Sequence, residues 1–320
     1  MPRSVAVLMD PIASIKIVKD TTFALLLEAQ RRGHALHYME QGDLALRQEA
    51  PFARLAPLSV RDDVNGWYLL GEPVWRDLRE MDLVLMRKDP PVDAEFVYDT
   101  MVLERAQRAG VMVVNDPRAL RDCNEKLFAL DFPQCMAPTL VARDADELKA
   151  FVAEHEEVVL KPLDGMGGRG IFRVRAGDPN LNVILETLLG GGPHGEGRRF
   201  TVAQRFIPQI QAGDKRILMV DGEPVPYALA RIPREGEFRG NLAAGGRGVG
   251  VPLNERDRWI AAEVGPALRQ RGLRFVGLDV IGDYLTEINV TSPTCARELD
   301  AQYGLNIAGL LFDALERDRA

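Results

Sequence analysis

The sequence predicts a two-part protein in which a parallel α/β unit precedes an α+β unit. Strand and helix patterns alternate over the first third of the 320 residues. This order is typical of a small parallel sheet with helices on both faces. After residues 115–117 the pattern changes to short strands separated by glycine-rich turns. We therefore expect an N-terminal α/β domain over residues 1–122 and a second domain over 123–320.

The elements of the first domain follow from apolar runs and helix-capping residues. Four apolar runs are typical of strands: residues 4–9, 34–39, 83–86 and 111–114. A helix that begins at Asp20 ends at Gly33, and a second helix over 94–109 stops at Gly110, because glycine suits a helix C-cap. Residues 41–81 are too irregular for element predictions.

The bulk composition is that of a globular chain, with 46% hydrophobic and 27% charged residues. A net charge of −7 argues against a general nucleic-acid surface. No apolar stretch approaches the ~20 residues that cross a bilayer, and the first strand is too short for a secretory signal. The odd number and wide spacing of Cys123, Cys135 and Cys295 fit neither a disulfide framework nor a zinc site. We expect a cytoplasmic protein without nucleic-acid or membrane partners.

A glycine-rich loop at residues 165–170 has the spacing G-x-G-x-x-G, which in other settings marks a dinucleotide-binding turn. That fingerprint has to open a helix, whereas residues 171–174 are β-branched and aromatic and predict a strand. The loop also lacks the Gly-Lys-Ser/Thr ending of a Walker loop. We therefore predict a hairpin flap whose backbone N–H groups close over phosphates.

Two lysines are candidate phosphate ligands. Lys161 lies within the apolar strand 158–163, where a lysine usually needs an anionic partner. Lys126 follows Asp122 and Glu125, whose spacing resembles a capping box that would begin a helix. For Lys161 we favour the phosphate over simple solvation, whereas for Lys126 both interpretations stay open at this point.

Residues 274–281 and 285–290 predict a hairpin, and the length of its turn decides which side chains meet. A two-residue turn would place Leu278 opposite Glu287, an apolar residue against a charged one. A three-residue turn over 282–284 pairs Leu278 with Ile288 instead, together with 281–285, Val280–Thr286 and Val276–Val290. Because a one-residue slip moves every side chain to the other face, hydrophobic matching favours the three-residue turn.

The favoured register brings three oxygen-bearing side chains to one face of the hairpin. Asp279 lies opposite Glu287, and Asn289 follows two residues further along the same face. Facing carboxylates repel each other unless a cation neutralises them, and oxygen ligands suit Mg²⁺. The competing interpretation is the solvated face of an edge hairpin, but the asparagine is harder to explain as solubility.

Six motifs resemble the bacterial glutathione synthetases of the ATP-grasp superfamily, and the resemblance covers nearly the whole chain. Each motif alone is weak, and together they are specific. The motifs are Met9-Asp10-Pro11-Ile12, Met86-Arg87-Lys88-Asp89-Pro90-Pro91, Arg121-Asp122-Cys123-Asn124-Glu125-Lys126, Lys161-Pro162-Leu163-Asp164-Gly165-Met166-Gly167-Gly168, Arg239-Gly240-Asn241-Leu242-Ala243-Ala244-Gly245-Gly246 and Thr286-Glu287-Ile288-Asn289-Val290-Thr291-Ser292-Pro293.

This resemblance implies an ATP-grasp fold preceded by a small parallel α/β domain. The ATP-grasp part would hold the flap within 123–200, and a mobile lid at 232–248 and the metal hairpin within 201–320. The implied reaction joins γ-glutamylcysteine and glycine to make glutathione, with ATP as co-substrate and an acyl phosphate as intermediate. The alternative is another ligase of the superfamily, of the D-alanine–D-alanine or glutamate-adding type. The family also implies a homo-oligomer, either a dimer or a tetramer.

The resemblance further implies roles for individual residues. The expected metal ligands, for magnesium or manganese, are Asp279, Glu287 and Asn289. The expected ATP-binding residues are Lys126, Lys161, Gly165, Met166, Gly167, Gly168, the adenine-reading hinge Gln204, Arg205, Phe206 and Ile207, and Asp214 at the ribose. The expected catalytic residues are Arg216, Arg231 and Arg239. The expected substrate-binding residues are Asp10, Arg87, Asn241, Ser292, Pro293 and Thr294.

Arginine suits this assignment because its planar guanidinium can bind a carboxylate or phosphate bidentately. Arg87 also follows a predicted parallel strand, at the end where α/β proteins bind ligands. A surface ion pair is the alternative for Arg216. For the glycine-rich lid, whose closure would exclude water, the alternative is an ordinary surface loop. One departure from the family is Arg169-Gly170 in the flap, where relatives are expected to carry small or hydroxylated residues.

Overall fold

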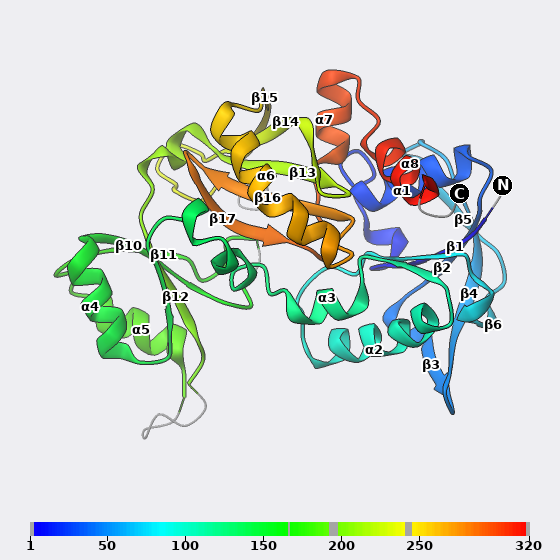
Figure 1. The fold of residues 1–320 in the computed structure, drawn as a ribbon, viewed down its shortest axis with the longest axis horizontal. Coiled ribbons are helices and arrows are strands. Elements are labelled where there is room, and N and C mark those ends of the chain that lie inside the picture. Colours follow the sequence, from blue (N-terminus) through cyan, green and yellow to red (C-terminus); the bar gives the residue numbers. More distant parts are fainter. Residues whose placement is uncertain (1–2, 166, 192–197, 241–244, 318–320) are drawn as a thin grey trace.

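Three sheets lie side by side in the computed structural model, which describes residues 3–165, 167–191, 198–240 and 245–317 (Figure 1). The N-terminal sheet lies at one end and the sheet whose strands lie between residues 139 and 205 at the other, with the sheet whose strands lie between residues 214 and 289 in the middle. Met166 and Asn241, two of the expected binding residues, lie outside the described ranges. No helix in the described part of the chain is long and apolar enough to cross a membrane.

Parallel strands form the centre of the N-terminal sheet, in the order β2-β1-β7-β8. Their bounds are Ser4–Leu8 for β1, Ala35–Met39 for β2, Leu83–Met86 for β7 and Met112–Val114 for β8. Val5 and Val7 of β1 share a core with helix α1 (Thr21–Arg31), whereas Ala6 and Leu8 share the opposite core with helix α2 (Ala94–Arg108). The parallel sheet with helices on both faces is thus confirmed.

Local signals place the helices of this domain. Helix α1 spans Thr21–Arg31 and α2 spans Ala94–Arg108. The Asp20 carboxylate accepts a hydrogen bond from the Phe23 N–H at 2.6 Å, and Gly33 and Gly110 take positive φ values beyond the two helix ends. Both boundaries therefore follow from capping chemistry that the sequence displays.

Residues 41–81, for which the pattern predicted no element, form four antiparallel strands. They are Leu44–Arg47 (β3), Ala50–Val60 (β4), Tyr68–Leu70 (β5) and Val74–Asp77 (β6). The long strand β4 pairs with β2 and β3 along one edge and with β5 and β6 along the other. Strand pairing, rather than an alternating pattern, determines this region.

The helix expected to begin at Asp122 and to carry Lys126 is wrong. Helix α3 spans Pro117–Asp122 and therefore ends where the capping box was expected to begin a helix. Asp116 caps its N-terminus and a proline occupies its first turn, which is a strong start signal. Lys126 lies in the turn that follows, where the Asn124 side chain accepts the Lys126 N–H at 3.0 Å.

The second sheet has the order β11-β10-β12-β9 and is antiparallel. Its elements are Thr139–Ala142 (β9), Glu157–Pro162 (β10), Phe172–Arg175 (β11) and Thr201–Arg205 (β12), with helices Ala145–His155 (α4) and Leu181–Leu189 (α5). Both helices pack on one face, around Leu160 and Ala203. Strand β11 directly follows the glycine-rich loop, so the hairpin prediction is confirmed and the dinucleotide interpretation stays excluded.

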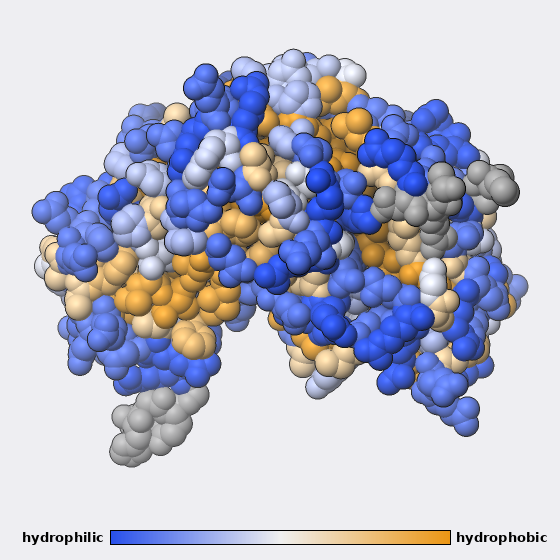
Figure 2. Space-filling view, viewed as in Figure 1, coloured by the Kyte–Doolittle hydropathy of each residue, from blue (hydrophilic) through white to orange (hydrophobic). Residues whose placement is uncertain are grey.

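The third sheet has the order β15-β14-β13-β16-β17 and is also antiparallel. Its strands are Asp214–Val220 (β13), Glu223–Ile232 (β14), Arg247–Pro252 (β15), Phe275–Ile281 (β16) and Tyr284–Asn289 (β17). The remaining helices are Glu255–Gln270 (α6), Ala296–Tyr303 (α7) and Ile307–Arg317 (α8). On the face in Figure 2 the surface is mostly hydrophilic, and hydrophobic side chains gather over the α4–α5 lobe.

The chain ends by returning to its beginning, because α8 packs against α1 and adds Leu311 and Phe312 to the core around Val5 and Val7. Asn115 links the N-terminal domain to the third sheet: its Nδ2 donates to the carbonyls of Phe275 and Val290 at 2.8 and 2.6 Å. We propose a domain boundary near residue 122. Helix α8 follows the second domain in sequence, but it covers the N-terminal domain.

Candidate active site

A cavity of about 840 Å³ lies where the three sheets meet. The second sheet contributes Lys161 and Gln204, the third contributes Asp214, Arg216 and Asp279, and the N-terminal domain contributes several acidic and basic side chains. Of the described site residues that the sequence predicts, the cavity wall includes Asp10, Lys126, Lys161, Gly165, Gly167, Gly168, Gln204, Arg205, Phe206, Ile207, Asp214, Arg216, Arg231, Arg239, Asp279, Glu287, Asn289, Ser292, Pro293 and Thr294. Arg87 is not in this wall.

The β16–β17 hairpin sets Asp279 directly opposite Glu287 and Leu278 opposite Ile288, as the favoured register predicted. The predicted three-residue turn is wrong, however, because Ile281 pairs with Tyr284 across a two-residue turn. The predicted pairs 281–285 and Val280–Thr286 are wrong for the same reason, since Val280 pairs with Leu285. A register shift beyond Asp279 leaves Thr286 as the extra residue of a β-bulge, and this bulge restores the Asp279–Glu287 pair.

Asp279 is held between two buried arginines. Arg216 of β13 donates from Nε and Nη2 to the two carboxylate oxygens at 2.5 and 3.0 Å. Arg231 of β14 places its Nη2 2.9 Å from Asp279 Oδ2. Burial would raise the pKa of Asp279, but the two guanidiniums outweigh it and hold that pKa below its ordinary range. Asp279 is therefore ionised at neutral pH although it is only 3% exposed.

Asp214 continues this chain of charges. Its Oδ2 accepts a hydrogen bond from Arg231 Nη2 at 2.5 Å, while its buried Oδ1 has no partner among the described residues. Burial raises the pKa of Asp214 to about 6, and Arg231 opposes that shift. A buried acceptor without a donor is costly, so a ligand that donates a hydrogen bond here would be stabilised.

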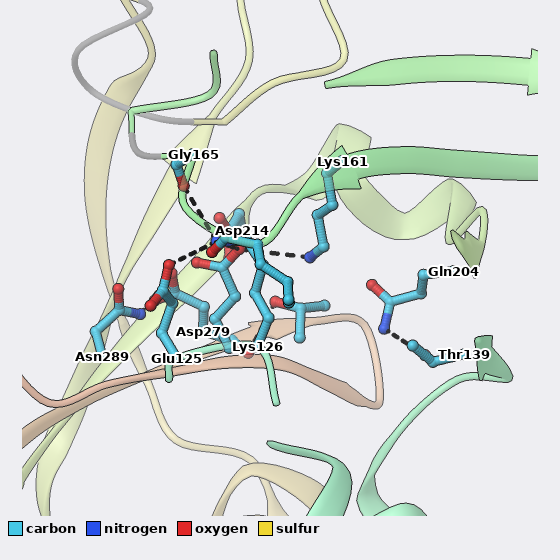
Figure 3. Close-up of polar contacts among 12 residues, drawn as sticks. Glu125, Lys126, Thr139, Lys161, Gly165, Gln204, Asp214, Asp279 and Asn289 are labelled. Atoms are coloured by element: carbon cyan, nitrogen blue, oxygen red, sulfur yellow. Dashed lines mark hydrogen bonds and ion pairs between the residues drawn. The ribbon is translucent and has the colours of Figure 1, made fainter. Parts of the chain in front are cut away.

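Two lysines from different parts of the chain, Lys126 and Lys161, point into the same polar cluster (Figure 3), and both lie close to Glu287. Lys161 Nζ of β10 lies 3.4 Å from Glu287 Oε1, and Lys126 Nζ lies 3.7 Å from the same oxygen. Lys126 also donates to Glu125 Oε1 at 2.6 Å. Burial would raise the pKa of Glu287, but the lysines outweigh it and the pKa is lowered. For Lys126, burial would lower the pKa, but Glu287 and Glu125 raise it above the ordinary value.

The glycine-rich loop joins β10 to β11 and contacts both Lys126 and Arg239. The Lys126 ammonium donates to the Gly165 carbonyl at 3.1 Å. Gly167 and Gly168 have positive φ values of 63° and 82°, which residues other than glycine rarely adopt. Arg239 Nη1 donates to the Gly168 carbonyl at 3.1 Å, so it links residues 232–248 to the flap.

At the end of the cavity formed by the N-terminal domain, short polar contacts fix the loop that follows β17. The Ser292 hydroxyl donates to Asp89, whose own N–H donates to Asp10 Oδ2 at 2.9 Å. Arg87 lies behind this loop, where its guanidinium donates to the Thr22 hydroxyl and the Pro293 carbonyl, both at 3.0 Å. Arg87 is 5% exposed, and burial lowers its pKa to about 10.

Four acidic residues of the cavity wall are absent from the predicted site residues: Asp20, Asp89, Glu125 and Glu298. Asp89 lies inside one of the six motifs, so that motif was an available signal. Asp20 was interpreted only as a helix cap, which it is. Glu298 has no sequence signal, because only the packing of α7 brings it to the cavity. Burial raises the pKa of Asp20 and of Glu298.

The hairpin offers several oxygen ligands that could hold a metal ion. Asn289 donates from Nδ2 to Asp279 Oδ2 at 3.2 Å, which leaves its amide oxygen as a further ligand atom. Within the described ranges, no three His, Cys, Asp or Glu side chains gather as a metal site. The candidate site therefore consists of two carboxylates and an amide.

Two sheets that enclose a cavity with buried lysines on one side and an acidic hairpin on the other define an ATP-grasp ligase. Solved structures share this fold. D-cycloserine synthetase DcsG matches with a TM-score of 0.65 at 15% identity, over 98% of this chain and all of that one. ATP-grasp ligase PsnB complexed with a minimal precursor matches with a TM-score of 0.63 at 17% identity, over all of both chains.

Sequence comparisons narrow this class to one family. The family description "Prokaryotic glutathione synthetase, N-terminal domain" matches residues 4–121, and its ATP-grasp domain matches residues 125–304. Glutathione synthetase of Xanthomonas axonopodis pv. citri is 70% identical over the whole of both chains. That of Vibrio cholerae is 57% identical over 97% of this chain and 96% of its own. The chain belongs to the prokaryotic glutathione synthetase family.

Proposed function

We propose that this enzyme joins the cysteinyl carboxylate of γ-glutamylcysteine to the amine of glycine, consuming ATP and releasing ADP and phosphate. The relatives named glutathione synthetase support this reaction. The observation that carries the proposal is the convergence of Lys126 and Lys161 on Glu287 beside the Asp279 ion pairs. Four cationic side chains from separate elements thus surround the paired residues Asp279 and Glu287, and such positive charge suits the transfer of a phosphoryl group.

The proposed reaction has two steps. An oxygen of the substrate carboxylate attacks the γ-phosphorus of ATP, the bond to the bridging oxygen breaks, and ADP leaves with that electron pair. The glycine amine then attacks the carbon of the acyl phosphate, phosphate leaves, and the nitrogen loses a proton to solvent. No nucleophile of the protein takes part, so the side chains act by positioning and by stabilising charge.

Roles for the cavity residues follow from their charges. Lys126 and Lys161 bind the phosphates of ATP, and Asp214 Oδ1 accepts a hydrogen bond from a ribose hydroxyl. Arg216 and Arg231 keep Asp279 ionised and stabilise negative charge on the transferred phosphoryl group. The flap and the lid, linked by Arg239 and Gly168, exclude water from the acyl phosphate.

Magnesium fits the hairpin by donor chemistry and by charge. Asp279, Glu287 and Asn289 supply the oxygen ligands that Mg²⁺ prefers. The acidic side chains around Lys126, Lys161, Arg216 and Arg231 nearly cancel their positive charge, so the residues alone offer little net attraction to a triphosphate. We propose these three residues as the ligands of magnesium, or of manganese, and the ion when bound would supply charge neutralisation at the phosphates.

An ADP-release assay tests the proposal, with γ-glutamylcysteine present throughout. Glycine should support turnover, whereas D-alanine or glutamate in its place should not. Release of ADP only with D-alanine or only with glutamate would overturn the acceptor assignment and favour another ligase of the superfamily. ATP binding without product from any of the three amines would indicate a module that binds nucleotide without catalysis.

The assembly and location also belong to the proposal. We propose a cytoplasmic homo-oligomer, because the free and buried cysteines suit a reducing compartment and several apolar side chains are exposed. Leu69, Val74 and Trp75 on the outer strands β5 and β6 are 72%, 56% and 45% exposed. A mass measurement in solution tests the oligomeric state, and a monomer at working concentration would contradict it.

A further inference from the structure

Thr139 and Gln204 lie beside each other on the cavity face of the second sheet. Thr139 of β9 pairs with Gln204 of β12, and Gln204 pairs in turn with Val159 of β10. Residues that pair in an antiparallel sheet point to the same side. The neighbouring Leu160 and Ala203 point to the other side and pack with α4 and α5. The Gln204 side chain therefore faces the cavity, where it is 5% exposed.

A count of protons fixes the orientation of the Gln204 amide. The Thr139 Oγ1 lies 2.8 Å from the Ala137 carbonyl oxygen and 3.0 Å from Gln204 Nε2. A carbonyl oxygen can only accept, so the single hydroxyl proton of Thr139 must lie toward Ala137. The lone pair of Thr139 then faces Gln204, and only the NH₂ group of the amide can meet it. A flipped amide would set two acceptors against each other.

The amide oxygen is consequently directed away from Thr139, toward the side where Lys161 and Asp214 lie (Figure 3). Gln204 Oε1 accepts no hydrogen bond from the described residues, so a ligand group that donates a hydrogen bond fits there. Lys161 lies two residues beyond Val159 on the same face of β10, a separation of about 7 Å along a strand. The amide oxygen therefore lies beside the end of the cavity where Lys161 would bind the phosphates. The base of a nucleotide bound in this way would be expected next to that end, at the amide oxygen.

We infer that Thr139 orients Gln204 so that its amide oxygen accepts the exocyclic amine of adenine, and that this pair selects adenine over 6-oxopurines. Adenine carries a hydrogen-bond donor at position 6, whereas hypoxanthine and guanine carry a carbonyl acceptor there. With the amide fixed, a 6-oxopurine would bring two oxygen acceptors together. Gln204 would contact the base, and Thr139 is a positioning residue. This inference rests on the proposed function, because it requires a nucleoside triphosphate in this cavity.

Comparison of ATP with inosine triphosphate tests the inference, because the two differ only in the hydrogen-bonding pattern at positions 1 and 6 of the base. The full-length enzyme is assayed by phosphate release with γ-glutamylcysteine and glycine. The variants are Thr139→Val, which keeps shape but lacks the hydroxyl, and Thr139→Ser, which keeps the hydroxyl. Gln204→Met and the double variant T139V/Q204M complete a mutant cycle.

The ratio of kcat/KM for ATP to that for inosine triphosphate should fall about tenfold in T139V, because the amide becomes free to flip. The ratio in T139S should stay close to that of the wild type. The double variant should show the same ratio as Q204M alone, since Thr139 acts only through Gln204. A merely structural role for Thr139 would instead lower kcat/KM equally for both nucleotides.

Several results would overturn the inference. They are an unchanged nucleotide ratio in T139V, whether or not the activity with both nucleotides falls equally, or additive effects of T139V and Q204M on the ratio. If T139V does not fold, an unchanged ratio in Q204M overturns it just as well. Failure of the proposed function is separate, because the wild-type enzyme would then not turn over ATP with these substrates at all.

Discussion

Two carboxylates of this protein lie among arginines, yet they serve different ends. Asp279 contacts Arg216 and Arg231 in the cavity, and Glu104 of α2 contacts Arg108, Arg118 and Arg121 near the surface. The hydrogen bond from Arg121 is the largest cause that lowers the pKa of Glu104 to about 2. The pKa of Asp279 is lowered as well.

The surroundings of the two carboxylates distinguish them. Glu104 connects α2 to α3, and its partners Arg108 and Arg118 have side chains that are 66% exposed. Asp279 and both its partners are buried. Next to them lie Asp214 Oδ1, which has no partner in the described part of the chain, and the two lysines that pair with Glu287. A buried ion pair beside polar atoms that still lack partners is therefore the better candidate for a functional site. The following four predictions test this distinction.

Asp279→Asn should have the largest effect and lower the rate of ADP release by at least about 100-fold, because the proposed metal site loses a carboxylate ligand and Arg216 and Arg231 lose their counter-ion. The native circular dichroism spectrum should persist, since asparagine keeps the volume of aspartate. Glu104→Gln is the matched control, in which turnover at neutral pH should equal that of the wild type. Full activity in D279N would refute its role in the site.

Lys161→Met should lower kcat/KM for ATP by about 100-fold, mostly through KM, because one of the two cations that face the phosphates disappears. Glu287 also loses a buried partner, so some loss of thermal stability should accompany the change. The control is Lys149→Met, which removes a lysine whose side chain is 42% exposed. Equal ATP kinetics in K161M and K149M would contradict the assignment of Lys161.

Asp214→Asn should raise KM for ATP by about tenfold, because a neutral amide is a weaker acceptor than a carboxylate for a ribose hydroxyl. A nucleotide without ribose hydroxyls, 2′,3′-dideoxy-ATP, sharpens this prediction. The wild-type enzyme should discriminate against it, and D214N should discriminate much less. If D214N retained the wild-type discrimination, Asp214 would not contact the ribose.

The smallest expected effect is on the acid stability of the α2–α3 contact. The pKa of Glu104 is about 2 in the folded protein and near 4.5 when unfolded, so its ion pairs stabilise the fold above pH 4.5. That contribution, about 1 kcal/mol for a partly solvated cluster, should fade as the pH drops from 4.5 toward 2. The Tm difference between wild type and E104Q should shrink over that range. A constant difference would show that the carboxylate charge is irrelevant.

Part of the site could be predicted because its residues lie within strong local patterns. Lys161 interrupts an apolar strand, and Leu278 and Ile288 demand a common face, which also sets Asp279 opposite Glu287. The prediction reached the correct pairing with the wrong turn. Hydrophobic matching constrains which side chains share a face, but it does not distinguish a longer turn from a short turn with a bulge.

Other parts of the site depend on contacts between distant segments. Nothing adjacent to Arg87 predicts that Thr22 and Pro293 enclose its guanidinium behind the cavity wall. Helix α3 begins at the Asp116–Pro117 signal and therefore ends at Asp122, before Lys126. Lys126 then lies in a turn that the Asn124 side chain stabilises by accepting the Lys126 N–H. Local capping signals competed there, and the sequence alone did not show which would prevail.

The sequence by itself determined the alternating α/β start, the glycine-rich hairpin and the shared face of Asp279 and Glu287. These features arise from side-chain periodicity and backbone preferences over a few residues. Only the tertiary structure decided that Arg216 and Arg231 enclose Asp279, that one oxygen of Asp214 finds no partner among the described residues, and that Thr139 fixes the Gln204 amide. Those features depend on which strands become neighbours, and neighbouring strands are chosen by the packing of the whole chain.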